Sequence, residues 1–131
     1  MAAGATPPLP PTPLARVLVV NDVRDITEFI GQHLTAHGYE VYLAYDGYDA
    51  LRKARYFRPD IIVLNIIMPH LDGLTAMPLL RAIPGLNAKI IINSAAIATR
   101  GPEIAAGADG ILPIPFAPQE LRAEVARLVP C

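Results

Sequence analysis

The chain has 131 residues, of which 53% are hydrophobic and 18% charged, and its formal net charge is −1. This length fits one compact domain with a buried core, and it excludes a second domain of ordinary size. The near-neutral charge argues against a dedicated nucleic-acid binder, and no apolar run approaches the roughly 20 residues needed to cross a membrane. No secretory signal is recognisable, so we expect a cytoplasmic protein.

The first segment differs in composition from the rest of the chain. Residues 1–14 are rich in Pro, Ala, Gly and Thr and offer little to bury. We expect them to form a disordered, Pro-rich leader, and we expect residues 15–130 to form the folded domain. The single cysteine, Cys131, excludes a disulfide or a cysteine metal site within one chain.

Short apolar runs predict the strands. They cover residues 17–20, 40–44, 61–64, 89–92 and 110–112, and the first and third are apolar throughout, which is typical of strands buried on both faces. Pro113 follows the last run and indicates a strand at the edge of the sheet.

Helical spacing predicts five helices between and after these strands. The first has Ile26, Phe29, Ile30 and Leu34 on its buried face and ends before Gly38; the others span residues 49–57, 74–83, 102–106 and 118–128. Pro78 lies inside the third helix, where we expect a kink or a later start because proline has no N–H to donate.

The alternation of strands and helices predicts an α/β fold. Five β-α units of about 20–25 residues imply a doubly wound parallel sheet with helices on both faces. We expect the strand order 2-1-3-4-5, with the working site beyond the carboxyl ends of the strands, where strands 1 and 3 are neighbours.

Several short motifs follow one another along this pattern. They are Val17-Leu18-Val19-Val20-Asn21-Asp22, Pro59-Asp60-Ile61-Ile62-Val63-Leu64-Asn65, Met68-Pro69, Asp72-Gly73, Ser94-Ala95, Gly107-Ala108-Asp109 and Pro115-Phe116. Together they resemble the response-regulator receiver domain of two-component signalling, the CheY-like family, over residues 16–129. The resemblance implies a flavodoxin-like fold, so the strand order given above is not an independent prediction.

The resemblance also implies a phosphorylation site. In the family an aspartate after strand 3 accepts a phosphoryl group, two acidic residues after strand 1 help to hold Mg²⁺, a Ser or Thr ends strand 4, and a Lys follows strand 5. The matching positions here are Asn65, Asn21 with Asp22, Ser94 and Ile114, and Ile111 stands at the switch position that is aromatic in many members. The family also has a cis peptide bond at the position of Pro115, which we expect here.

These substitutions remove the chemistry of the family's site. The carboxamide of Asn65 is neutral and a poor nucleophile, only Asp22 remains of three carboxylates, and the lysine is lost. We expect no catalytic residue, no metal and no cofactor. Asn21, Asn65 and Ser94 could hydrogen-bond one another and Asp22, which predicts a metal-free network that fixes the loops in one state.

The resulting hypothesis is a pseudo-receiver. It would be a phosphorylation-independent protein-interaction module in two-component-type signal transduction, not an enzyme, with a kinase, a regulator or a second copy of itself as partner, and with no nucleic acid or membrane. Two alternatives stay open. One is a phosphoryl-accepting switch with a non-standard acceptor such as Asp22; the other is a small-ligand sensor, which requires an enclosed apolar pocket near Ile66, Ile111 and Ile114.

Two side-chain clusters remain to be explained. All five tyrosines lie in the second strand, the second helix and the loop between them, at positions 39, 42, 45, 48 and 56. Packing around the second strand is the preferred interpretation, and an interface is the alternative. His33 and His37 are four residues apart on a helix, but without a third ligand we expect a solvated face and no metal site.

Overall fold

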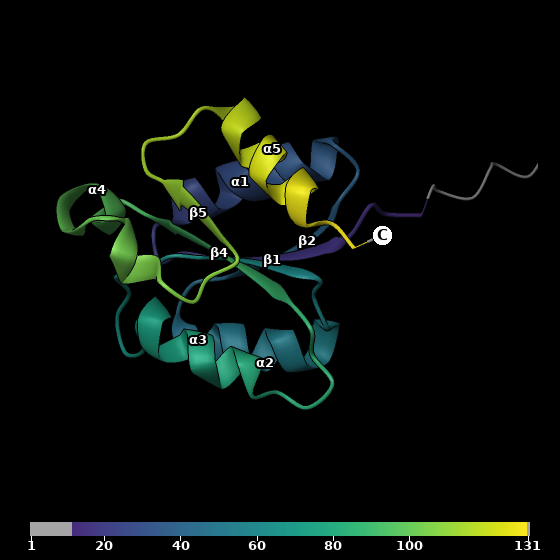
Figure 1. The fold of residues 1–131 in the computed structure, drawn as a ribbon. Helices are drawn as coiled ribbons and strands as arrows, with labels where there is room; N and C mark the ends of the chain where they lie inside the picture. The colour runs from purple at the N-terminus through teal and green to yellow at the C-terminus, as the bar shows by residue number, and fades with distance from the viewer. Residues whose placement is uncertain (1–11, 131) are drawn as a thin grey trace, which may run out of the picture.

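The computed structural model describes residues 12–130, so residues 1–11 of the expected leader and Cys131 lie outside the described residues. Five parallel strands form one sheet with the order β2-β1-β3-β4-β5 (Figure 1). The strands are β1 (Arg16–Val20), β2 (Glu40–Ala44), β3 (Ile61–Leu64), β4 (Lys89–Ser94) and β5 (Gly110–Pro113). The predicted fold class and strand order are confirmed, and β5 with Pro113 lies at an edge of the sheet.

Helices cover both faces of this sheet. They are α1 (Arg24–Ala36), α2 (Gly47–Phe57), α3 (Gly73–Arg81), α4 (Ala96–Arg100), the 3-10 helix η1 (Pro102–Ala105) and α5 (Pro118–Leu128). Helices α1 and α5 cover one face, and α2 and α3 cover the other (Figure 1). None of the helices within residues 12–130 has the length and hydrophobicity that crossing a membrane requires.

Alternate residues of each central strand enter two separate cores. Val17 and Val19 of β1 lie in the core under α1 and α5, whereas Leu18 and Val20 lie in the core under α2 and α3. This explains why β1 and β3 read as unbroken apolar runs. Each fully buried aliphatic side chain contributes about 1.5–3 kcal/mol to folding, so the two cores supply the main stabilisation.

Aspartate caps determine where α2 and α3 begin. An Asp46 Oδ1 atom accepts a hydrogen bond from the N–H of Asp49 (2.7 Å), and Asp72 Oδ1 accepts one from the N–H of Thr75 (2.8 Å). Because Asp72 caps α3, the helix starts at Gly73 and not after Pro78. Helix α3 ends at Arg81, two residues before the predicted end.

The short fourth helix predicted over residues 102–106 is present as a 3-10 helix, but the α-helix that precedes it was missed. Helix α4 occupies Ala96–Arg100, and Pro102–Ala105 forms only a 3-10 turn. The hydroxyl oxygen of Ser94 accepts a hydrogen bond from the N–H of Ala96 (3.2 Å), and this contact lies at the first residue of α4. Gly101, at φ 89°, then ends α4 in a conformation that favours glycine.

Candidate functional site

The predicted site positions meet at the carboxyl edge of the sheet. Asn21 follows β1, Asn65 follows β3, Ser94 is the last residue of β4, and Ile114 follows β5. Backbone hydrogen bonds tie this edge together, since the N–H of Asn65 donates to the carbonyl of Val20 (2.9 Å) and the N–H of Ile114 donates to that of Ser94 (3.3 Å). The structure therefore places these residues where ligands bind in open parallel sheets.

The carboxamide of Asn65 is the centre of this edge. Its Oδ1 accepts a hydrogen bond from the N–H of Ile66 (2.9 Å), while its Nδ2 donates to the carbonyl oxygen of Ile67 (2.9 Å) and, over a longer distance, to Oδ1 of Asp22 (3.4 Å). The opposite orientation of the amide would set Oδ1 against the carbonyl oxygen of Ile67, two acceptors facing each other. The surrounding groups thus fix the direction of the amide.

The loop after Asn65 is closed by Gly73. The N–H of Gly73 donates to the carbonyl of Ile66 (2.7 Å), and a Cβ at position 73 would lie only 1.9 Å from the carbonyl oxygen of Asn65. Only glycine allows this approach. Sequence reasoning included Gly73 in a motif but missed this role, and it missed Ile67 altogether because a backbone carbonyl leaves no signal in residue type.

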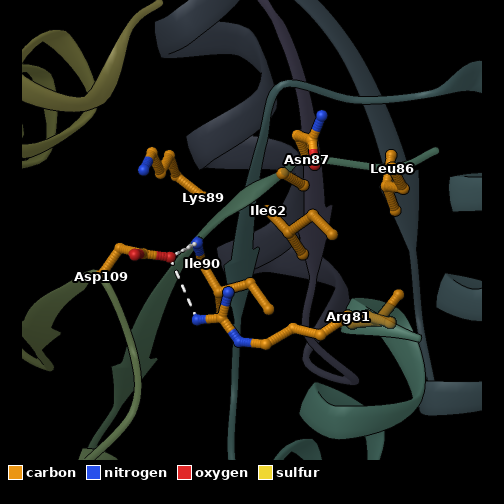
Figure 2. A pocket seen from close by; sticks show the side chains of 9 residues that line it. Ile62, Arg81, Leu86, Asn87, Lys89, Ile90 and Asp109 are labelled. Atoms are coloured by element: carbon orange, nitrogen blue, oxygen red, sulfur yellow. Dashed lines mark hydrogen bonds and ion pairs between the residues drawn. The ribbon is translucent and has the colours of Figure 1, made fainter. Parts of the chain in front are cut away.

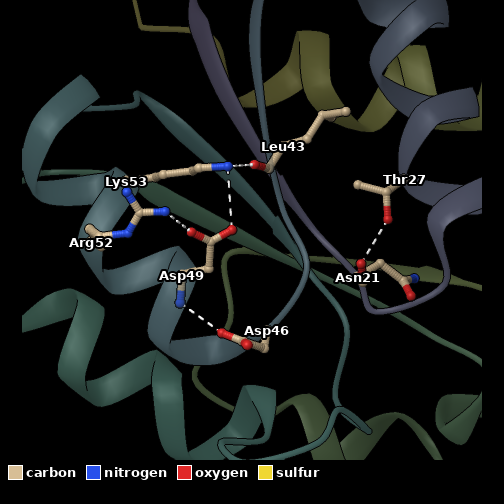
Figure 3. Close-up of polar contacts among 7 residues, drawn as sticks. All are labelled: Asn21, Thr27, Leu43, Asp46, Asp49, Arg52 and Lys53. Carbon is tan, nitrogen blue, oxygen red and sulfur yellow. Dashed lines mark hydrogen bonds and ion pairs between the residues drawn. The ribbon is translucent and has the colours of Figure 1, made fainter.

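Asn21 and Ser94 use their polar groups locally. The Oδ1 atom of Asn21 accepts a hydrogen bond from the N–H of Val23 (2.9 Å), and the hydroxyl of Thr27 donates to the backbone carbonyl of Asn21 (2.8 Å; Figure 3). The hydroxyl oxygen of Ser94 serves the N–H of Ala96. The expected network of all four side chains is therefore not formed: among Asn21, Asp22, Asn65 and Ser94, the hydrogen bond between Asn65 and Asp22 is the one present.

The two isoleucines of the β5 region lie in different surroundings. Ile111 packs against the core under α2 and α3, and its N–H donates to Oε2 of Glu124 (3.1 Å). Ile114 is half-buried, the peptide bond between it and Pro115 is cis, and it lines a groove of about 290 Å³ on the α1 side. Ile66 is buried in the α2–α3 core. Ile66, Ile111 and Ile114 therefore do not line one common pocket, which the small-ligand alternative requires.

Phe29 also lines the groove beside Ile114. It was predicted to lie on the buried face of its helix, but 46% of its surface is exposed. Ile30 and Leu34 of α1 are fully buried and fill the core, so the helix turns Phe29 toward its edge, where it lies beside Ile114 and Phe116.

The donor set at Asn65 does not fit Mg²⁺. This cation takes hard oxygen ligands, usually one or two carboxylates together with water and phosphate oxygens. The two oxygens nearest the amide, Asp22 Oδ1 and the carbonyl oxygen of Ile67, already face the hydrogens of Asn65 Nδ2. A positively polarised N–H group thus stands where a cation would be needed. Within residues 12–130 no group of three His, Cys, Asp or Glu side chains is arranged to hold a metal, and the His33–His37 pair has no third ligand.

Comparison with known proteins identifies the family to which this fold belongs. A model of the family described as "Response regulator receiver domain" matches residues 17–126. The chain belongs to this family. The receiver domain is similar to Response regulator MprA of Mycobacterium ulcerans and of Mycobacterium tuberculosis, with 40% identity over 116 residues in each case. The aligned region covers 87% of this chain but 50% of MprA, so the chain spans about half the length of these curated relatives.

Solved receiver domains superimpose closely on this one. The receiver domain of sensor histidine kinase PA1611 from Pseudomonas aeruginosa has a TM-score of 0.80 and 30% identity, covering 88% of this chain and 97% of that one. TrrA from Thermotoga maritima has a TM-score of 0.77 and 33% identity, covering 86% and 97%. The PA1611 structure has magnesium coordinated in its active-site cleft, and the TrrA structure is a complex with Mg²⁺ and BeF.

Proposed function

We propose that this receiver domain is a pseudo-receiver, a protein-interaction module of two-component signalling that works without phosphorylation at Asn65. The observation that supports the proposal is the carboxamide of Asn65, whose Nδ2 donates toward Asp22 and the Ile67 carbonyl. A residue that accepts a phosphoryl group must present an anionic oxygen as nucleophile. Asn65 instead presents an N–H group that donates hydrogen bonds.

Three requirements of phosphoryl transfer are not met here, although Asp22 and the hydroxyl of Ser94 are retained. The Oδ1 atom of Asn65 is uncharged and accepts a hydrogen bond from Ile66, so it is a weak nucleophile. The position after β5 carries the aliphatic side chain of Ile114, which cannot stabilise the charge of a transferred group. Without a fitted cation the repulsion between a phosphoryl donor and Asp22 is not offset.

The same contacts hold the loops at the carboxyl edge of the sheet in a single conformation. Asn65 joins the loop after β3 to the loop after β1 through Asp22, and Gly73 closes the β3–α3 loop over it. A surface held in this way can be recognised without a covalent switch. We expect a protein partner such as a sensor kinase, a regulator or a second copy of the chain, with neither nucleic acid nor membrane involved. Absence of catalysis and a cytoplasmic location belong to the same proposal.

Asp22 is the residue on which the alternative phosphoryl-accepting switch depends. It is exposed and keeps its carboxylate, but one oxygen accepts a hydrogen bond from Asn65, and the position after β5 holds Ile114 in place of the family's lysine. The same experiment that tests Asn65 also tests Asp22, because peptide mapping distinguishes the two sites.

The test is incubation with acetyl phosphate and Mg²⁺ followed by intact-mass measurement. We expect no phosphoryl adduct on the natural sequence. The matched control is the triple variant N21D/N65D/I114K, which restores the family's charges and is expected to gain one phosphoryl group. A stoichiometric adduct on the natural sequence, whether at Asn65 or at Asp22, would overturn the proposal.

A further inference from the structure

The outer face of α2 carries an unusual combination of side chains. Tyr48, Arg52, Arg55 and Tyr56 stand at i, i+4, i+7 and i+8, so they share one side of the helix. The two tyrosines are 60% and 79% exposed, and the side chain of Arg52 is 74% exposed. We call these four residues the α2 outer face. The sequence analysis left packing and an interface open as interpretations of the tyrosines, and packing in the core does not bury Tyr48 or Tyr56.

A shallow apolar groove continues this face toward the end of α2. It has a volume of about 500 Å³ and is lined by Arg52, Lys53, Arg55, Tyr56 and Phe57. The ring of Phe57 is stacked on Tyr42, with centroids 3.8 Å apart, and Tyr56 meets Phe57 edge-on at 4.9 Å. The sheet therefore holds one wall of the groove in place, while Tyr56 forms an exposed wall.

Positive charge is concentrated on the same helix. Four of the eleven basic residues of a chain with net charge −1 lie between positions 52 and 58. Arg52 and Lys53 both pair with Asp49 (Figure 3). The guanidinium of Arg55 makes no hydrogen bond or ion pair with another residue in the part of the chain that the structure describes. The helix thus presents more positive charge than its own carboxylate neutralises.

The backbone beneath this surface is already ordered. Asp46 caps the start of α2, and four small or aliphatic residues hold its inner face in the core. At the other end Arg58 takes a left-handed conformation, its N–H donates to the carbonyl of Ala54, and its guanidinium donates to the carbonyl of Pro84 (2.9 Å). A partner would therefore meet a rigid helix and order only side chains, which lowers the entropic cost of binding.

From these features we propose that the α2 outer face and its groove dock a short acidic segment of a partner protein. Carboxylates of the segment pair with Arg52 and Arg55, and an apolar side chain of the segment packs against Tyr56 and Phe57. Aromatic residues and arginine are the types that dominate protein interfaces. The inference names a partner class for the interaction module and to that extent rests on the proposed function, but it is tested by binding and not by phosphorylation.

A short peptide fits this surface better than a nucleic acid does. The carboxylates of Asp46 and Asp49 lie at the first turn of α2, next to Tyr48. A duplex carries a negative charge every ~1.7 Å of its axis and would meet these carboxylates as well as the arginines. A peptide with a few carboxylates needs only the stretch from Arg52 to Phe57.

The test is a titration of isotopically labelled protein with a peptide of repeated Asp, Glu and Leu residues, followed by backbone NMR. We expect shift changes centred on residues 48–57 and a Kd below about 1 mM. R55E should weaken binding about fivefold or more, since it replaces an attraction with a repulsion at an exposed site. The matched control is R100E, which changes the charge equally at another exposed last-turn arginine, in α4, and should leave the affinity unchanged.

Further measurements test the apolar contact and the alternative binding partners of this surface. Y56A should weaken the peptide with Leu but not a version with Ser in place of Leu, which isolates the apolar contact. The proposal is overturned if the peptide shifts residues outside α2, if no saturation occurs below about 1 mM, or if R100E loses as much affinity as R55E. Tighter binding of oligothymidine, or self-association through α2, would also overturn it by showing a different partner. Phosphorylation of Asn65 would contradict the proposed function, but it would not change the set of residues whose NMR shifts respond to the peptide, so the two proposals can fail independently.

Discussion

The side-chain amide of Asn65 faces the carboxylate of Asp22, with Nδ2 3.4 Å from Oδ1, and so links the loop after β3 to the loop after β1. The contact pairs a donor with an acceptor. Two carboxylates at the same positions would repel each other and would need a cation between them. The amide therefore lets this edge of the sheet hold together without a bound ion, and the following predictions start from that difference.

Replacing Asn65 by Asp should destabilise the protein near pH 7. The N65D variant loses the N–H donor to Ile67 and Asp22 and adds a negative charge beside a carboxylate, so we expect the free energy of unfolding to fall by about 1–3 kcal/mol. Protonation of the new carboxyl relieves this repulsion, so the loss should diminish as the pH falls toward about 4. Urea unfolding at several pH values measures this.

Magnesium supplies the control for N65D. It should restore stability to the variant, because a cation can then bind between two carboxylates. The natural protein should show no Mg²⁺-dependent NMR shifts at Asp22 or Asn65 at about 10 mM, since a site with one carboxylate stays largely empty at that concentration. NMR shifts that saturate well below this Mg²⁺ concentration would contradict the conclusion that the groups around Asn65 do not fit Mg²⁺.

Adding one methyl group at Gly73 should disturb the loop that covers Asn65. In G73A the new Cβ would lie 1.9 Å from the carbonyl oxygen of Asn65, and a backbone atom cannot move aside cheaply. We expect a destabilisation of about 2–3 kcal/mol and altered amide shifts at Asn65 and Ile66. The control is G107A, where the nearest atom is Met77 Cε at 3.9 Å and only the positive φ of 94° is unfavourable, at a cost of about 1 kcal/mol. Equal losses in the two variants would exclude the steric explanation.

Asp109 should contribute stability that depends on pH. Its Oδ2 accepts hydrogen bonds from the N–H of Ile90 (2.8 Å) and from Arg81 Nη2 (3.1 Å; Figure 2). Partial burial raises the pKa of this carboxyl, but the Ile90 N–H and the Arg81 guanidinium outweigh burial and hold the pKa below its ordinary value. A lowered pKa in the folded state gives stability that is present above the unfolded pKa and is lost as the pH falls through the folded pKa.

The variant that tests this contribution is D109N. Because solvent screens the partly exposed Arg81–Asp109 pair, we expect the free energy of unfolding at pH 7, measured by urea unfolding, to fall by only about 1 kcal/mol. The difference between D109N and the natural protein should begin to shrink near pH 4, where the unfolded carboxyl starts to take up a proton, and should vanish only below the lower pKa that Asp109 has in the folded protein. A difference that stays constant across this pH range would show that the amide costs stability for a reason other than charge.

His33 should make the protein less stable in mild acid. Burial, with smaller effects from the charges of His37 and Arg122, lowers the pKa of the His33 imidazole, and its Nε2 is buried without a hydrogen-bond partner among the described residues. Because the folded state resists protonation, the unfolded state binds the proton more readily, and the free energy of unfolding falls as the pH drops below about 6.5. H33Q should flatten this slope.

NMR titration of His33 provides the direct measurement. The midpoint of its ring signals should lie below about 6.5 in the natural protein. Removing a nearby positive charge with R122Q should move that midpoint upward. If the midpoint in R122Q does not change, the charge of Arg122 has no part in the shift.

The order of elements could be read from the chain because each strand and helix is encoded by local periodicity. Residues 40–44, 61–64 and 118–128 form β2, β3 and α5 with the predicted bounds. Pro102 is a strong local helix-start signal, and a short 3-10 helix does begin there. Helix α4 was missed because it has no such signal; the hydrogen bond that precedes it is accepted by Ser94, which is buried at the end of β4, from the N–H of Ala96. Phe29 matched the spacing of a buried face, but only the packing of α1 on the sheet showed that its ring reaches the edge.

The chemical identity of the site was also visible in the residues, since an amide at position 65 and an isoleucine at position 114 are uncharged wherever they lie. Which atoms those groups contact was not visible. Asn21, Asn65 and Ser94 were expected to bind one another, yet Asn21 and Ser94 bond to the backbone two residues further on, and Asn65 binds Ile67 and Asp22. A polar side chain bonds to whichever donor or acceptor the folded backbone brings within hydrogen-bonding distance. For Asn21 and Ser94 that group lies in the segment that follows each residue, whereas Asn65 reaches Asp22 only because β1 and β3 are paired side by side in the sheet.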